Sequence, residues 1–244
     1  MSVPKYRLDA IETIGRKILQ EYDPALLDGP PQAVPIETII ETKFDLTLEY
    51  HCLRKNGSIL GETIFDEGAA ILYDQDEKRY RLIAVKAGTI LVEERLCVDR
   101  LLGRLRFTCA HELGHWVLHQ KLYSGTGDVA AYEGKTSLDE SHGLVEWQAD
   151  ALATALLMPL PQIKRSFYRL RAGRSNEQLV AEMAQIFQVS KQAMRVFGWK
   201  HAISYKFGTA SPPPERGAQP HQCSQALLYA FCSQFSEHGR RRMA

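Results

Sequence analysis

The stretch from Arg106 to His119 reads RFTCAHELGHWVLH, and its first two histidines, His111 and His115, stand four residues apart. The pattern from about residue 104 to 120 is helical, and residues four apart on a helix lie one turn apart on the same face. Two imidazoles placed in this way can share one Zn²⁺ at about 2.0–2.1 Å. Glu112 stands beside them and can accept a proton from an attacking water. The spacing therefore predicts a metal site with its own base, the alternative being a helix with two surface histidines.

A catalytic zinc needs a third protein ligand and one open position. A second strong helix is expected over about 142–158, where Glu146 is followed one turn later by Asp150. We expect Glu146 to be the third ligand and Asp150 to accept the spare N–H of a ligand histidine, which would fix its tautomer. The alternative is a solvated acidic face. The alternating alanines from 149 to 155 favour close helix packing instead.

Four more polar residues are candidates for the site. His119 extends the histidine stripe by another turn, but a straight helix rarely wraps three side chains around one ion, so we expect it beside the ligands or on the floor of a cleft. His142, Tyr123 and Tyr132 are candidates for stabilising an oxyanion. A capping or surface role is the alternative for each of them.

The remaining patterns predict an α+β fold, with a helical core and a small, mostly antiparallel sheet. Strands are expected over 45–50, 58–65, 69–73, 80–86 and 89–93. Further helices are expected over 7–22, from Pro35, and over 161–171, 176–187 and 190–198. The polar stretch 120–143 is expected to be a loop over the site. We predict a metal-binding domain over 1–160, a small helical region over 161–207, and a linker with a final amphipathic helix and basic tail over 208–244.

Residues 176–199 resemble a helix-turn-helix. Lys191, Gln192, Arg195 and Lys200 are available on its second helix to read DNA. The alternative is a packing element that supports the core or receives the substrate. The net charge of +1 favours packing, although direct DNA binding stays open.

Composition limits the compartment and the metal ligands. The five cysteines are widely spaced and none forms a Cys-x-x-Cys pair, which argues against a disulfide framework and against a thiolate zinc site. The first residues lack the pattern of a signal peptide, and no apolar run approaches the roughly 20 residues of a membrane span. A cytoplasmic protein without membrane association is expected.

Two blocks of sequence resemble a known family. The stretch from Arg106 to His119, and the later EWQAD of 146–150 running on to LLMP at 156–159, are similar to the core of the ImmA/IrrE metallopeptidases. The resemblance covers about residues 7–200. It implies a zincin-like core in which His111, His115 and Glu146 hold one zinc and Glu112 is the general base, with Asp150 at the family's usual Asx position.

The resemblance also implies a function. Members of this family act in transcription regulation and stress responses, and several cleave helix-turn-helix repressors. We therefore expect a zinc-dependent endopeptidase that cuts a regulatory protein, such as a helix-turn-helix repressor or an antitoxin-like partner. The alternative is a DNA-binding or partner-binding regulator whose metal site is structural. Two histidines and one carboxylate would also suit Mn²⁺ or Fe²⁺.

Overall fold

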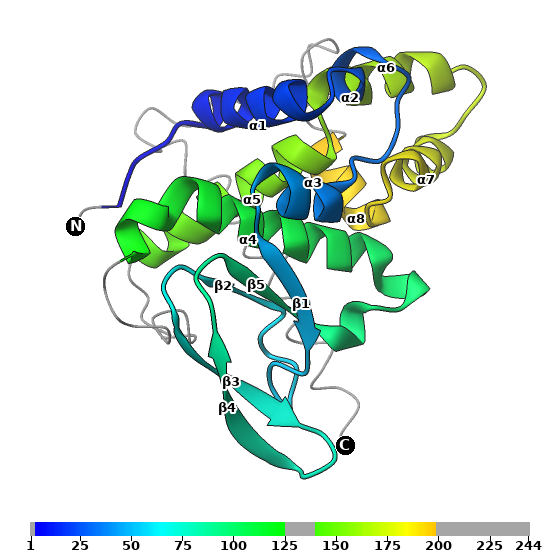
Figure 1. The fold of residues 1–244 in the computed structure, drawn as a ribbon. Coiled ribbons are helices and arrows are strands. Elements are labelled where there is room, and N and C mark those ends of the chain that lie inside the picture. Colours follow the sequence, from blue (N-terminus) through cyan, green and yellow to red (C-terminus); the bar gives the residue numbers. More distant parts are fainter. Residues whose placement is uncertain (1–2, 125–139, 199–244) are drawn as a thin grey trace.

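The structure is a computed structural model that describes residues 3–124 and 140–198 of the chain (Figure 1). Its helices are α1 (Leu8–Tyr22), α2 (Ala25–Asp28), α3 (Ile36–Lys43), α4 (Leu102–Tyr123), α5 (Glu140–Leu157), α6 (Leu160–Leu170), α7 (Asn176–Phe187) and α8 (Lys191–Ala193). Its strands are β1 (Thr47–His51), β2 (Gly61–Ile64), β3 (Gly68–Asp74), β4 (Arg79–Val85) and β5 (Thr89–Glu93). The predicted α+β fold is confirmed.

Helix α4 lies between the other helices and the strands (Figure 1). One side of α4 packs on α5, and other parts of it contact β2 and β5. Because it is covered in this way, α4 buries apolar residues such as Leu105, Cys109 and Leu113 along with polar ones. The element that carries both motif histidines is therefore the central helix of the fold.

Small residues bring the helices close together. A Cβ atom on Gly114 of α4 would lie 2.9 Å from the Cα atom of Ala149 on α5. A Cβ atom on Gly15 of α1 would lie 2.9 Å from the Cβ atom of Ala155, on the same α5 helix. Three helices thus pack side by side at distances that a larger residue at either glycine would not allow.

The strands form two sheets instead of the single one that we expected. One sheet has the order β1-β5-β2, and the other is the β3–β4 hairpin, which lies farthest from the helices (Figure 1). Strand β5 pairs antiparallel with β2 but parallel with β1, in the register Thr47↔Thr89. A parallel pair needs a long connection, which the chain between β1 and β5 supplies. Alternating side chains predict strands but do not specify their partners or directions, so the expectation of one mostly antiparallel sheet was incomplete.

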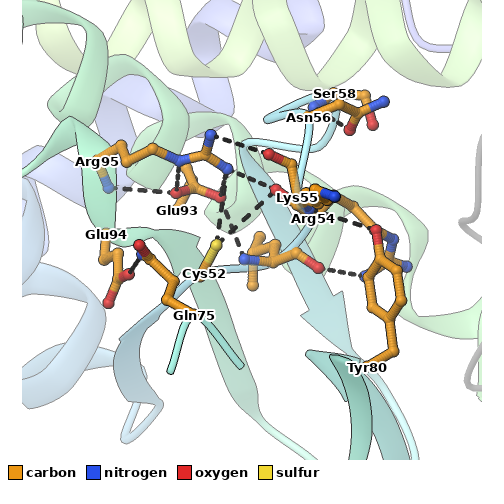
Figure 2. Close-up of polar contacts among 11 residues, drawn as sticks. Cys52, Arg54, Lys55, Asn56, Ser58, Gln75, Tyr80, Glu93, Glu94 and Arg95 are labelled. Atoms are coloured by element: carbon orange, nitrogen blue, oxygen red, sulfur yellow. Dashed lines mark hydrogen bonds and ion pairs between the residues drawn. The ribbon is translucent and has the colours of Figure 1, made fainter. Parts of the chain in front are cut away.

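A buried carboxylate holds the long loop between β1 and β2 against the end of β5. The side chain of Glu93, which is 1% exposed, accepts hydrogen bonds from the main-chain N–H of Leu53 at 3.1 Å and from Arg95 Nε at 2.6 Å. Figure 2 shows the Arg95 guanidinium reaching from Glu93 to the loop, where it donates to the carbonyl oxygens of Arg54 and Lys55. The network anchors the loop that leads into β2.

Helices α6 to α8 pack on the same apolar core as helices α1 to α5. A capping box begins α7, with Ser175 and Gln178 each accepting from the other's main chain. Beyond α7, Gln188 adopts a left-handed conformation and Ser190 caps α8, which continues as a π-helical turn over Met194–Gly198. The connection between α7 and α8 packs on the start of α4, since a Cβ atom on Gly103 would lie 2.7 Å from the main-chain nitrogen of Ser190. The described part of the helix-turn-helix-like segment, residues 176–198, therefore packs on the core, and direct DNA binding stays a prediction.

Several boundaries differ from the prediction. Helix α4 continues to Tyr123 and α5 begins at Glu140, so the connection is shorter than the expected loop 120–143. The one-turn helix α2 was not predicted, because four residues carry no helical period. Lys200 and the segment 208–244 lie outside the described residues, and the domain limits stay a prediction. Among the helices of residues 3–124 and 140–198, none combines the length and apolar character that a bilayer span requires.

Candidate metal centre

Three side chains from α4 and α5 bring their ligand atoms together. The Nε2 atoms of His111 and His115 lie 2.9 Å apart. Carboxylate oxygens of Glu146 lie 3.3 Å from the first and 3.5 Å from the second. The i, i+4 spacing on α4 sets the two rings edge to face, with centroids 4.6 Å apart, and the close α4–α5 packing brings Glu146 to them. The sequence-predicted trio thus meets at one point.

The geometry suits a small divalent cation. Ligands at 2.0–2.1 Å around a tetrahedral zinc ion are about 3.3 Å from one another, close to the separations seen here. The His115 side chain is 1% exposed and that of His111 is 17% exposed, whereas Glu146 is 36% exposed. The side of the cluster nearest to Glu146 therefore faces solvent and leaves an approach for a fourth ligand. Two neutral nitrogens and one carboxylate, with an open side, match the donor set of a catalytic zinc site.

Asp150 contacts the first histidine as the sequence predicted. Its carboxylate oxygen Oδ1 lies 2.8 Å from Nδ1 of His111 and accepts the proton of that nitrogen. Burial lowers the pKa of His111, but the hydrogen bonds to Asp150 and Glu146 outweigh it and hold the pKa well above its ordinary value. The cluster therefore stabilises a positive charge at the point where the ligand atoms meet.

The second histidine has a different partner. Nδ1 of His115 lies 3.2 Å from Nδ1 of His119, and Nε2 of His119 lies 2.9 Å from the side-chain oxygen of Gln148. The amide nitrogen of Gln148 in turn donates to the carbonyl oxygen of Pro4 at 2.7 Å. His119 lies beside the ligands, and burial lowers its pKa.

Glu112 lies on the strand side of α4, where β2 makes room for it. Oγ1 of Thr63 donates to Oε2 of Glu112 at 2.7 Å. A Cβ atom on Gly61 would lie 2.4 Å from the other carboxylate oxygen, so a side chain at this position would displace the carboxylate of Glu112. Burial raises the pKa of Glu112 to about 7, although the charge of His111 and the hydrogen bond from Thr63 act in the opposite direction. A carboxylate with such a pKa is suited to accept and return a proton near neutral pH.

The oxyanion candidates remain predictions. The ring of Tyr123 stacks on that of Phe65, with centroids 5.2 Å apart. It lies eight residues beyond His115, or about 12 Å along the helix axis. Tyr132 lies outside the described residues. His142 belongs to α5, but its side chain is also outside the described part.

Sequence reasoning missed Thr63, Gly61 and the part that Gln148 plays. The first two belong to a strand that carries no motif, and their contact with Glu112 depends on how β2 packs on α4. Gln148 stood inside a quoted block, two residues from Glu146 and from Asp150. Its polar side chain on an otherwise alanine-rich, buried helix face was the available signal.

Comparisons with known proteins bear on this site. A family model described as Peptidase_M78, IrrE N-terminal-like domain, matches residues 74–197, just over half of the chain. Among curated proteins, none matches. A solved structure, a Mycobacterium tuberculosis transcriptional regulator, is similar with a TM-score of 0.45 and 16% sequence identity. That similarity covers 87% of this chain and 50% of the regulator, so the chain spans about half the length of that protein.

Proposed function

We propose, since this chain belongs to the Peptidase_M78 family of IrrE N-terminal-like domains, that it is a zinc-dependent endopeptidase. The family assignment agrees with the resemblance of the two sequence blocks. One observation carries the proposal beyond a peptidase family in general: the ligand atoms of His111, His115 and Glu146 all lie within 4.8 Å of one another. Glu112, adjacent in sequence to the first ligand, is held separately by Thr63.

In this proposal the three ligands hold the metal and Glu112 moves the proton. A bound zinc ion would supply Lewis-acid chemistry, polarising a peptide carbonyl and lowering the pKa of water. Glu112 removes a proton from the water as the water oxygen bonds to the peptide carbon. It then passes this proton to the leaving nitrogen as the C–N bond breaks. Thr63 aims the carboxylate, and a pKa near 7 allows Glu112 to act in both directions.

Strand β2 is suited to bind the substrate backbone. It is an edge strand of the sheet β1-β5-β2, and Leu60 O accepts from Glu93 N on the side facing β5. Because antiparallel pairs alternate, the main-chain groups of Gly61 and Thr63 point to the outer edge. An extended peptide added there would lie beside Glu112. This supports an endopeptidase that binds an extended segment of a protein.

We assign the substrate by class. The resemblance to ImmA/IrrE peptidases supports a regulatory protein, with a helix-turn-helix repressor or an antitoxin-like partner as the candidates. Such a partner resides in the cytoplasm. The cysteines of this chain are widely spaced and form no Cys-x-x-Cys pair, which suits a protein of that reducing compartment.

The test combines metal analysis with a cleavage assay. Wild type and Glu112→Gln would each be expressed with candidate helix-turn-helix regulators from the same genome. We expect one zinc per chain in both proteins and cleavage by the wild type alone. Metal in both proteins with regulation retained by Glu112→Gln would instead favour a regulator with a structural metal. A wild-type protein without stoichiometric metal would overturn the proposal.

A further inference from the structure

A continuous line of hydrogen bonds leads from His115 to the first described residues of the chain. It passes from His115 Nδ1 to His119 Nδ1, from His119 Nε2 to the side-chain oxygen of Gln148, and from the Gln148 amide nitrogen to Pro4 O. The histidine side chains come from α4 and the glutamine from α5. His115 is 1% exposed, and both His119 and Gln148 are fully buried. Water is therefore not available to replace the contacts among these three side chains, whereas Pro4 at the end of the line is only partly buried.

The donor and acceptor in each hydrogen bond follow from the acceptor at the end of the line, Pro4 O. A main-chain carbonyl such as Pro4 O can only accept, so the amide nitrogen of Gln148 must face it. The amide oxygen then faces His119 and accepts the proton carried by Nε2. His119 has no carboxylate among its hydrogen-bond partners in the described residues, and a fully buried ring in such surroundings is neutral.

A neutral imidazole carries a proton on one nitrogen only. With the proton on Nε2, Nδ1 of His119 has a lone pair and must accept. The proton between the two rings therefore belongs to Nδ1 of His115, which leaves a lone pair on Nε2 of His115. That nitrogen is the one that lies 2.9 Å from Nε2 of His111, inside the ligand cluster.

We propose that His119 and Gln148 are positioning residues that, with the carbonyl of Pro4, set the tautomer and orientation of His115 so that its Nε2 lone pair faces the metal. The inference rests on the metal site of the proposed function and adds to it. The carboxylate of Asp150 sets the tautomer and orientation of His111 in the same way, through one charged contact. For His115 the tautomer and orientation are set by three successive neutral hydrogen bonds. A neutral relay adds no negative charge beside a site that already contains Glu146, Glu112 and Asp150.

The first measurement uses metal-free protein with ¹⁵N-labelled histidine rings, since ring nitrogen shifts separate protonated from bare nitrogens. We expect His115 to be protonated on Nδ1 and bare on Nε2, and His119 to be protonated on Nε2 and bare on Nδ1. His119→Asn removes one set of signals and so assigns them. A proton on Nε2 of His115 with Nδ1 bare would overturn the proposal.

The second measurement is zinc affinity by chelator competition. His119→Leu removes the acceptor, and Gln148→Leu removes the partner that orients His119, so we expect each to weaken zinc binding by roughly 10–100-fold. His119→Asn keeps an oxygen close to the place of Nδ1 and should bind zinc within about threefold of wild type. Leu118→Val, a neighbouring buried change outside the relay, is the control and should leave affinity unchanged.

The two proposals fail in different ways. Unchanged zinc affinity in folded His119→Leu and Gln148→Leu would overturn the relay while leaving the peptidase intact. A wild-type protein that binds no zinc would overturn the peptidase, and the histidine tautomers of the metal-free protein would still decide the relay. If His119→Leu does not fold, the comparison of Gln148→Leu with wild type gives the same decision.

Discussion

His111 and His115 belong to one motif, yet their surroundings differ in charge. His111 donates to a carboxylate, and its pKa is raised, whereas His115 donates to a neutral ring. A histidine with a raised pKa keeps its proton until the metal displaces it, so metal and proton compete mainly at His111. This asymmetry leads to a prediction on the pH dependence of metal binding.

We expect zinc affinity to fall as the pH falls through the raised pKa of His111, starting above its ordinary value of 6.5. Below that pKa one proton must leave for each ion bound, which costs about tenfold in affinity per pH unit. Chelator competition between pH 6 and 9 would measure it. Asp150→Asn, which removes the charge that favours the proton, should move the dependence to lower pH. An affinity that is constant over the range would contradict the assignment.

The raised pKa of Glu112 leads to a second prediction, which concerns the stability of the metal-free protein. Its pKa is about 7 in the fold against an ordinary 4.5, so between these values the folded chain holds a proton that the unfolded chain has released. The free energy of unfolding therefore falls as the pH rises through this window, by about 3 kcal/mol in total for this group. Glu112→Gln cannot titrate and should be the more stable protein above pH 7. Urea unfolding at pH 5 and pH 8 with a chelator present would measure the difference, and parallel pH dependences in both proteins would count against it.

At the scale of elements, strand β2 determines where the base lies. Its residues Gly61 and Thr63 face the same side of the sheet, and both contact Glu112. The loop before β2 is anchored by Glu93, so the strand is held in place from the end of β5. The position of Glu112, the proposed proton acceptor, thus depends on an element that carries none of the three proposed metal ligands.

We expect Gly61→Ala to displace the carboxylate of Glu112 without affecting the ligands. The added methyl group would overlap the carboxylate oxygen, 2.4 Å away. A shift of about 1 Å in a reacting group costs on the order of 100-fold in rate, so cleavage should fall by that factor while one zinc stays bound. Peptide turnover and metal content measure the two effects. Gly173→Ala, which strains a backbone with φ of 70° where no other atom is within 4 Å, controls for lost stability alone. Full activity in Gly61→Ala would disprove the role of β2.

The elements also show which features could be predicted from sequence. His111 and His115 could be, because their spacing within one helix is local and a helical period shows where they point. The parallel partner of β1 could not, since an alternating strand pattern is the same for every partner. The contacts of Thr63 with Glu112 and of Gln148 with Pro4 join positions 49 and 144 residues apart, which only packing brings together.

At the scale of the whole molecule, the site depends on the distance between α4 and α5. Two histidines lie on one helix and Glu146 on the other, and Gly114 against Ala149 sets how closely they approach. Helix α1 covers the far side of α5 through an equally close contact at Gly15. The two glycines allow the effect of overpacking to be separated from damage to the site.

We expect Gly114→Ala and Gly15→Ala to lower the free energy of unfolding by similar amounts, about 1–3 kcal/mol. The first change pushes α4 away from α5 and separates Glu146 from the histidines, so zinc affinity should also fall. The second acts between α1 and α5 and should leave zinc affinity within a few-fold of wild type. Urea unfolding and chelator competition on both proteins measure the pair. Equal losses of zinc affinity would show that general loosening, and not ligand separation, weakens the site.

The relay from His115 ends on the carbonyl oxygen of Pro4, and every amino acid offers that group. Residue 4 could therefore be replaced during evolution without removing the last acceptor, provided that the backbone keeps its course. In an alignment of homologues, the amino acid at this position would vary even if the hydrogen bond were maintained in every one of them. Only a superposition of homologous backbones would reveal that the carbonyl group at a variable position is linked by hydrogen bonds to a proposed metal ligand.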